Sequence, residues 1–184
     1  MCGSAKFTHA PEDLRKLGVN KIVPMSIFSR SGISSGIILP SMDMTQAIFG
    51  LDLGYEHRLI NARKESLGEK VYLSDTIPCI VPVSMFYEKQ ESYLESSRLP
   101  KGYWVKSDDD SILTLAGVCR QNYVGDTEYA IVTTKADLGI QNFHDRMPLI
   151  VESEVWLDNH KLFKAYQKDV KLLFKPVENK QYNY

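Results

Sequence analysis

The most constraining feature of this sequence is a series of short apolar segments, rich in β-branched and aromatic residues, that polar stretches separate. Segments of this composition favour β-strands. We expect strands at residues 21–23, 36–39, 47–51, 57–60, 79–87, 102–106, 111–118, 128–134 and 171–174. Strands do not alternate regularly with long helices, as a parallel α/β sheet would require. The sequence therefore predicts an α+β fold with a curved, mostly antiparallel sheet.

Two stretches have helical features. The segment THAPEDLRKLG places Pro11 in a first turn, follows it with acidic residues and closes with Gly18, a combination that favours a short helix. The polar stretch 151–167 has Val155, Leu162 and Phe163 at spacings that suit a partly buried helix. We expect these short helices to flank the sheet.

Length and composition favour one domain over residues 1–184. The chain has 184 residues, of which 43% are hydrophobic, enough to bury a proper core. The Gly/Ser-rich stretch 29–36 is expected to be a mobile loop of that domain, because neither side has enough chain for a second core. No apolar run approaches the roughly 20 residues of a membrane-spanning helix, so we expect no membrane contact and a monomer in solution.

The cysteines indicate a reducing compartment. Cys2, Cys79 and Cys119 have neither CxxC nor Cys/His metal spacing, and no secretory apolar segment follows Met1. We expect no metal or other cofactor and a cytoplasmic protein, associated with the nucleoid if it is bacterial. The formal net charge of −1 argues against a protein that coats nucleic acid, because such binding needs many phosphate contacts. A local basic groove remains possible.

Four polar positions interrupt apolar surroundings. Asn61 and Arg63 would face the same way if a strand runs through NAR. Glu88, after an apolar run, is either a solvated carboxylate or a buried general acid with a raised pKa. His144 in FHDRMP is either a structural or a functional histidine. Thr133, at the end of EYAIVTT, is compatible with ordinary strand propensity. Individually, these residues do not decide between the alternatives.

Cys2 has two interpretations as well, since free cysteines usually behave as small buried hydrophobes. Several motifs taken in order are more informative. They are MCG at the start, NAR at 61–63, a P-C-x-V-P-x-x-x-F-Y-E pattern at 78–88, AG at 116–117, IVTT at 131–134 and HDRMP at 144–148. Together they resemble the SOS response-associated peptidase (SRAP) family along nearly the whole chain.

The resemblance implies a barrel-like, β-rich α+β fold and a role in the DNA damage response. In that family the residue after the removed methionine links covalently to abasic sites in single-stranded DNA and shields them. It implies a catalytic set of Cys2, Asn61, Glu88 and His144, and DNA contacts by Arg63, Arg146, Phe49 and Thr133. The expected partner is thus single-stranded DNA that contains abasic sites.

The chemistry of a terminal cysteine accounts for the position of Cys2. Its free α-amine can form an imine with the sugar aldehyde, and the adjacent thiol can close a thiazolidine ring. On this interpretation Glu88 protonates the ring oxygen of the closed sugar, His144 shuttles protons and Asn61 holds the N-terminal backbone. Two alternatives stay open. One is a peptidase that removes its own Met1, and the other is a non-catalytic module that binds single-stranded DNA.

The sequence also departs from the family pattern. Ser4 stands where arginine is common, Phe49 and Gly50 stand where many members have a Trp-Gly pair, and Lys89 replaces a frequent tryptophan. These changes concern the expected DNA surface rather than the catalytic set, since another aromatic face can still stack on a base.

Overall fold

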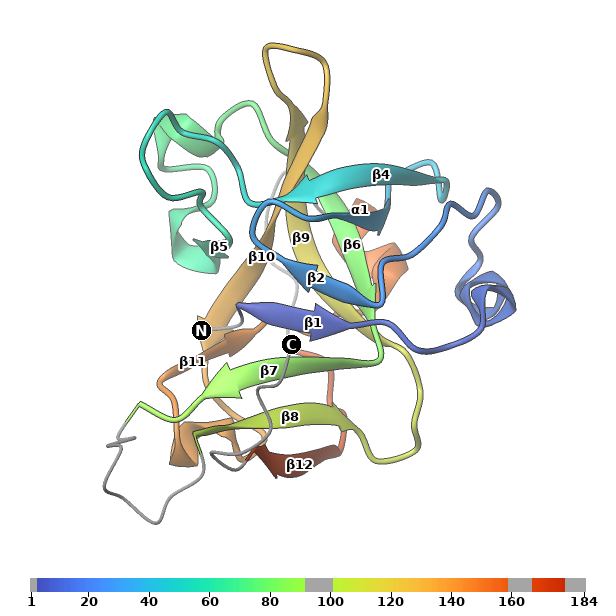
Figure 1. Ribbon diagram of the computed structural model, residues 1–184, viewed down its shortest axis with the longest axis vertical. Helices are drawn as coiled ribbons and strands as arrows, with labels where there is room; N and C mark the ends of the chain where they lie inside the picture. Colours follow the sequence, from blue (N-terminus) through green and yellow to red (C-terminus); the bar gives the residue numbers. More distant parts are fainter. Residues whose placement is uncertain (1–2, 92–100, 159–166, 178–184) are drawn as a thin grey trace.

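The computed structural model describes residues 3–91, 101–158 and 167–177, which fold into two packed β-sheets with a few short helical segments (Figure 1). The strands are β1 (Ser4–Lys6), β2 (Phe28–Arg30), β3 (Ser34–Ile38), β4 (Met44–Phe49), β5 (Asn61–Arg63), β6 (Ile77–Val83), β7 (Met85–Lys89), β8 (Gly102–Ser107), β9 (Leu113–Gln121), β10 (Thr127–Lys135), β11 (Arg146–Pro148) and β12 (Leu172–Val177). The helical segments are η1 (Pro11–Leu17), η2 (Lys64–Ser66), η3 (Val71–Leu73), η4 (Ile140–Asn142) and α1 (Ser153–Asp158). The predicted α+β class with short helices is confirmed.

The larger sheet closes into a barrel. Its order is β11-β10-β4-β3-β6-β9, and β9 pairs with β10 as well as with β6. The path β10-β4-β3-β6-β9 therefore returns to β10, which leaves no free edge on this ring. β5 continues along β10 beyond β4, while β11 pairs antiparallel with the end of β10. The pairings of β10 with β4 and β5 are parallel, and the other strand pairings in the described part of the chain are antiparallel.

The second sheet is five-stranded, with the order β12-β8-β7-β1-β2. The chain enters it from the barrel at Ser84, between β6 and β7. The Ser84 backbone N–H donates to the Lys6 carbonyl oxygen at 2.7 Å, and its Oγ accepts from the Thr8 N–H at 2.7 Å. The apolar run 79–87 is thus two strands in different sheets, not the single strand that its composition predicted, because Ser84 bonds to β1 and its neighbour instead of continuing the barrel pairing.

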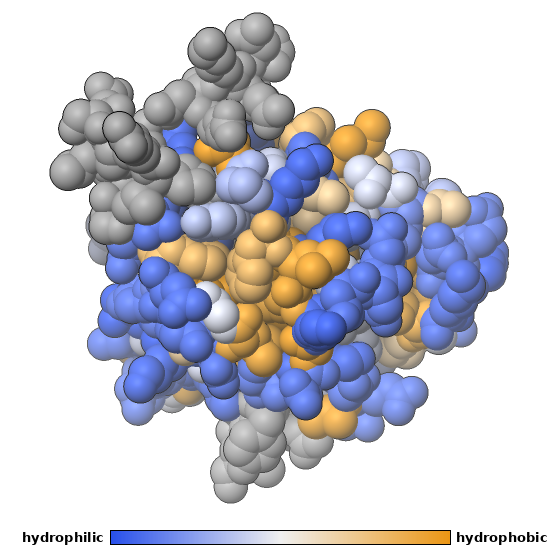
Figure 2. Space-filling view, turned by 90° about the horizontal axis from the view of Figure 1, so that it is seen from below, coloured by the Kyte–Doolittle hydropathy of each residue, from blue (hydrophilic) through white to orange (hydrophobic). Residues whose placement is uncertain are grey.

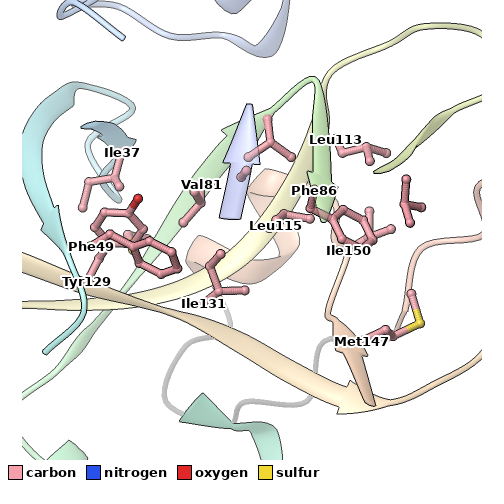
Figure 3. Packing of buried hydrophobic residues seen from close by; sticks show 14 of the residues in the cluster. Ile37, Phe49, Val81, Phe86, Leu113, Leu115, Tyr129, Ile131, Met147 and Ile150 are labelled. Atoms are coloured by element: carbon pink, nitrogen blue, oxygen red, sulfur yellow. The ribbon is translucent and has the colours of Figure 1, made fainter. Parts of the chain in front are cut away.

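The core lies inside the barrel and between the two sheets (Figure 3). Phe49 of β4 and Tyr129 of β10 stack with ring centroids 5.0 Å apart, and both side chains are fully buried. Phe86 of β7 belongs to the same cluster as Leu115 and Ile131 of the barrel. The second sheet therefore covers part of the barrel and buries its own inward face by doing so.

Several expected elements differ from the structure. Residues 29–36 are not a loop throughout, because they contribute to β2 and β3 around a turn in which the Ile33 N–H donates to Arg30. Residues 21–23 form no strand, and 57–60 contain only an isolated bridge between Leu59 and Leu51. The apolar residues that suggested these strands pack against buried residues without forming strands, as Val23 and Leu59 do.

Both predicted helical stretches contain helical residues in the described part of the chain. η1 is a 3-10 helix, and Gly18 ends it in the left-handed conformation with φ of 79°. α1 buries Trp156 and Leu157, whereas Val155 is 47% exposed, so the predicted buried face is wrong at that residue. Leu162 and Phe163 lie outside the described residues.

Within the described part of the chain, no helix is long and apolar enough to cross a membrane. Seen from the side on which β12 lies, the molecule has apolar residues gathered near the centre of the face, with hydrophilic residues around them (Figure 2).

Candidate functional site

Three of the predicted site residues lie at the junction of the two sheets. Asn61 begins β5, where it is opposite Ile131 of β10, and His144 lies just ahead of β11, which pairs with the same strand. Glu88 comes from β7 in the other sheet. Oε1 of Glu88 lies 3.8 Å from Nε2 of His144. The fold thus brings Glu88 and His144 together although they are far apart in sequence.

The start of β1 lies beside these residues. Ser4 is opposite Tyr87, the neighbour of Glu88 in β7. A Cβ placed on Gly3 would lie 4.0 Å from Cδ1 of Ile60, the residue before Asn61. β1 therefore starts between the strand that carries Glu88 and the strand that carries Asn61. Cys2 itself lies outside the described residues.

Glu88 is buried because of its place in the alternation of β7. Met85, Tyr87 and Lys89 face outward, while Phe86 and Glu88 face the interior, and Glu88 has no exposed surface. Burial raises the pKa of the Glu88 carboxyl from its ordinary 4.5 to about 7, and the charge of Glu91 acts in the same direction. A carboxyl group with this pKa holds a proton on a substantial fraction of molecules near neutral pH, as a general acid must.

The ring of His144 is oriented by the backbone. Nδ1 accepts a hydrogen bond from the Arg146 N–H at 2.9 Å, so the neutral ring carries its proton on Nε2. Nε2 lies 3.8 Å from Glu88 and 3.5 Å from Oε1 of Glu91. The Asp145 carboxylate is 3.2 Å from Nδ1, but it is 71% exposed and screened by water, so we assign the tautomer from the backbone N–H.

The protonation of His144 follows from its surroundings. Burial lowers the pKa of His144 below its ordinary value, and the charges of Glu91 and Asp145 oppose that effect. The imidazole is therefore mainly neutral at neutral pH and presents an N–H donor from Nε2. Glu88 and His144 together offer one acidic proton and one oriented hydrogen-bond donor.

Arg146 is held by a clamp of acceptors. Its guanidinium donates to both carboxylate oxygens of Glu65, at 2.6 and 2.9 Å, and to the Thr133 carbonyl oxygen at 2.7 Å. The Arg146 side chain is 12% exposed. This hydrogen bonding lowers the pKa of Glu65 to about 2. Arg146 therefore positions the segment next to His144.

The predicted DNA contacts are only partly compatible with the structure. Arg63 is exposed at the end of β5 and near enough to Glu65 to lower its pKa further. Phe49 and Thr133 have no exposed surface, and Arg146 is already paired. A buried ring offers no face to a base and a buried hydroxyl reaches no phosphate, so of the four expected DNA contacts only Arg63 is both exposed and outside the Glu65 clamp.

One group of side chains has a composition that could hold a cation. Ligand atoms of Glu91, His144 and Asp145 all lie within 4.8 Å of one another. Nδ1 of His144 already accepts the Arg146 N–H, and both carboxylates are exposed. Exposed carboxylates beside a committed imidazole do not make a closed metal site. We therefore assign no metal to this group.

Sequence reasoning missed two residues of the site. Glu65 gave no strand signal, because β5 ends at Arg63 and Glu65 lies in the helical segment η2 that follows. Glu91 gave no such signal, because β7 ends at Lys89 and only the turn beyond it brings the Glu91 carboxylate to His144.

Comparisons with known proteins identify the family of this chain. A family model described as SOS response associated peptidase (SRAP) matches residues 41–184, which include Asn61, Glu88 and His144. No curated protein matches the chain.

Solved structures share the fold. A protein from Bordetella bronchiseptica matches with a TM-score of 0.77 at 16% identity, covering 96% of this chain and 100% of its own. A phage-related protein from the same organism matches with a TM-score of 0.71 at 22% identity, covering 96% and 94%. A protein from Bacteroides thetaiotaomicron matches with a TM-score of 0.68 at 20% identity, covering 85% and 81%. At these identities the likeness concerns the fold alone.

Proposed function

This chain belongs to the SOS response-associated peptidase family, and on that premise we propose that it links covalently to abasic sites in single-stranded DNA through Cys2 once Met1 has been removed. The membership associates the protein with the response to DNA damage. The nucleophile, the substrate and the linkage are the proposal.

The observation that carries the proposal is the buried pair of Glu88 and His144 beside the first residues of β1. Consecutive Cα atoms are 3.8 Å apart, so Cys2 lies within about 7.6 Å of Ser4, measured between Cα atoms. Ser4 is opposite Tyr87, next to Glu88. The chain between Ser4 and Cys2 is therefore long enough to allow an amine and a thiol at Cys2 to reach a proton donor that burial has tuned to neutral pH.

The reaction begins with the opened sugar. The α-amine of Cys2 adds to the C1′ aldehyde, and loss of one water gives an imine. The thiolate then adds to the imine carbon while the nitrogen takes up a proton, which closes a five-membered thiazolidine. An internal cysteine cannot close this ring, because its nitrogen is an amide.

The other residues have roles that fit their surroundings. The protonated Glu88 donates to the ring oxygen of the closed sugar and then to the departing water, both of which need an acid near pH 7. The Nε2–H of His144 donates to the hydroxyl that ring opening creates. Asn61, at the start of β5, holds the N-terminal backbone in place.

The test is the intact mass of the protein after mixing with a single-stranded oligonucleotide that carries one abasic site. We expect a protein that begins at Cys2 to gain the mass of the oligonucleotide less one water. The same chain with an additional residue before Cys2 is the matched control and should gain nothing. Cys2→Ser should give at most a labile adduct, because a hydroxyl is the poorer nucleophile. A stable adduct on the blocked control would overturn the proposal.

The family description favours a second candidate, a peptidase that removes Met1 by means of the same residues. The two functions separate by substrate. Purified protein that still carries Met1 should lose it on incubation alone if the protein is its own peptidase, and Glu88→Gln or His144→Ala should slow that loss. Retention of Met1 over the same period would leave removal to another enzyme.

A further inference from the structure

The outward face of the five-stranded sheet has an unusual charge distribution. The five strands β1, β2, β7, β8 and β12 contain one carboxylate, Glu88, and it faces the interior. The register places every cation of these strands on the opposite face, together with three aromatic side chains. The cations are Lys6, Arg30, Lys89, Lys106 and Lys175, and the aromatic residues are Phe28, Tyr87 and Trp104. We call these eight residues the basic sheet face.

We propose that the basic sheet face binds the single strand of DNA that extends from the lesion. The position of the lesion in this inference rests on the proposed function, whereas the binding surface does not. The whole chain has a net charge of −1, so a face with five cations and no carboxylate along its strands is locally distinct, and of these cations Lys106 pairs with Asp110 beyond the end of β8 at 2.8 Å. Its charge is complementary to a phosphate backbone and opposed to an acidic partner.

The aromatic residues make nucleic acid the best match for this charge. Tyr87 and Trp104 lie opposite each other on β7 and β8, with ring centroids 5.5 Å apart. Nζ of Lys6 lies 4.3 Å from the centroid of Trp104 and 4.7 Å from that of Phe28. Phe28 is 51% exposed. Cations interleaved with rings are the surface that single strands prefer, because rings stack on bases while cations contact phosphates.

The basic sheet face begins at the candidate site. Lys89 directly follows Glu88 and faces outward where Glu88 faces inward. Ser4, at the start of β1, lies between Tyr87 of β7 and Arg30 of β2. From this edge the sheet continues through β8 to β12, where Lys175 is opposite Trp104 (Figure 1). A strand whose abasic nucleotide is in the site would reach this face around the edge of the sheet at which β1 starts and β7 ends.

The face also accounts for one departure from the family pattern. Arg146, an expected DNA contact, pairs with Glu65 instead. Lys89 supplies a cation where the family often has tryptophan, and Trp104, on the adjacent strand, supplies an aromatic ring near it. The face therefore has both a cation, Lys89, and an aromatic ring, Trp104, with the ring on β8 instead of at position 89.

The test compares two variants with the same change in net charge. Lys89→Gln with Lys175→Gln removes two exposed cations of the face, and neither residue belongs to the Glu88–His144 site. Lys16→Gln with Lys70→Gln removes two cations from η1 and from the turn before η3, away from the face. The probe is an undamaged single-stranded oligonucleotide of about 12 nucleotides, a length within the range of one binding face.

We expect the face variant to bind this probe several-fold more weakly, and its slope of log affinity against log salt to fall by about 1.4, since each lost contact to a single strand removes about 0.7. The control variant should match the wild type. Trp104→Ala should weaken binding without changing the slope, and Trp104→Phe should restore most of it. Equal affinity and slope in the face and control variants would overturn the inference.

The two proposals can fail separately. Binding of the undamaged probe requires no covalent chemistry, so it tests the face even if the wild type forms no adduct. If the adduct forms, its rate at saturating DNA should be the same in the face variant and the wild type, and only the DNA concentration required for half the maximal rate should rise. A lower maximal rate in a folded face variant would count against a surface that only binds.

Discussion

Nε2 of His144 and Oε1 of Glu88 face each other across 3.8 Å; Glu88 belongs to β7 of the second sheet, and His144 lies just ahead of β11 of the barrel sheet. This distance is longer than a direct hydrogen bond. A substrate oxygen or a water that bonds to both groups can therefore bring them into one network. The contact also makes the site dependent on how the second sheet packs against the barrel.

Glu88 is expected to make the stability of the protein depend on pH. Its pKa rises from 4.5 to about 7 on folding, so between these values the native state holds a proton that the unfolded chain has released. The contribution of Glu88 to the free energy of unfolding should be complete below about pH 4.5 and fall by on the order of 3 kcal/mol as the pH rises through about 7. Glu88→Gln should lose this contribution.

The contribution of Glu88 can be measured by urea unfolding of the wild type and of Glu88→Gln at about pH 5 and about pH 8. The difference between the two proteins isolates this one carboxyl from the other groups that titrate. The wild type should lose more stability over this interval than the variant. Parallel behaviour of the two proteins would mean that Glu88 is not titrating in this range.

The rate of adduct formation should depend on the same proton. If Glu88 acts as the acid, the rate at saturating DNA falls as the pH rises through about 7, because the protonated fraction declines. Glu88→Gln should be much slower and lack this descending limb. A wild-type profile that keeps rising through pH 7 to 8 would instead report the amine of Cys2 as the dominant titrating group.

Glu65 is predicted to be a positioning residue for His144. Its carboxylate holds the Arg146 guanidinium through two hydrogen bonds, and the backbone N–H of Arg146 holds Nδ1 of His144. Glu65→Ala should loosen this segment, reduce adduct formation several-fold and alter the ¹⁵N shifts that report the tautomer of His144. Glu69→Ala is a suitable control, since Glu69 is a nearby exposed carboxylate. An unchanged His144 spectrum in Glu65→Ala would exclude this role.

The composition of individual segments correctly predicted several of the strands. The segments expected at residues 36–39, 47–51, 102–106 and 128–134 overlap β3, β4, β8 and β10. The closure of the barrel depends on β9 pairing with both β6 and β10, which is a relation between distant segments that local composition does not encode. The break at Ser84 has the same origin, since Ser84 bonds to Lys6 and Thr8.

For the site, the sequence indicated which residues to consider, but it did not indicate which of their side chains are exposed. Glu88 could have been recognised as buried, because alternation in MFYEK places it on the same face as Phe86. Phe49 and Thr133 carried an expected role in DNA binding from the family resemblance, but whether a side chain is exposed depends on what packs over it. In this fold the barrel interior covers Phe49, so its aromatic ring serves the core.

Phe49 should accordingly affect stability instead of DNA binding. Its ring stacks on Tyr129 in the barrel, so Phe49→Ala should cost about 3–5 kcal/mol in the free energy of unfolding. Phe49→Leu should cost less, because it leaves a smaller cavity. Denaturant titration measures the cost, and at a temperature where Phe49→Leu stays folded its affinity for single-stranded DNA should equal that of the wild type. Weaker binding by the folded Phe49→Leu would restore a direct role for the ring.

Gly117, the second residue of the AG pair at 116–117, has little room for a side chain. A Cβ on Gly117 would lie 2.8 Å from Sγ of Cys79, 3.0 Å from Cγ2 of Val81 and 3.3 Å from the Ala130 carbonyl oxygen. Gly117 is opposite Cys79 in the pairing of β9 with β6, inside the closed barrel, so the neighbours have little room to move. Gly117→Ala should therefore overpack the barrel and cost about 1–3 kcal/mol.

A double variant separates this overpacking from a general effect on the strand. Cys79→Ala removes the sulfur that the new methyl group would meet, so the cost of Gly117→Ala should be smaller in that background than in the wild type. The coupling between the two substitutions, obtained from four urea titrations, should thus be favourable. If the two costs simply add, the contact with Cys79 is not what excludes a side chain at Gly117, and the carbonyl oxygen of Ala130 on the adjacent strand becomes the limiting neighbour.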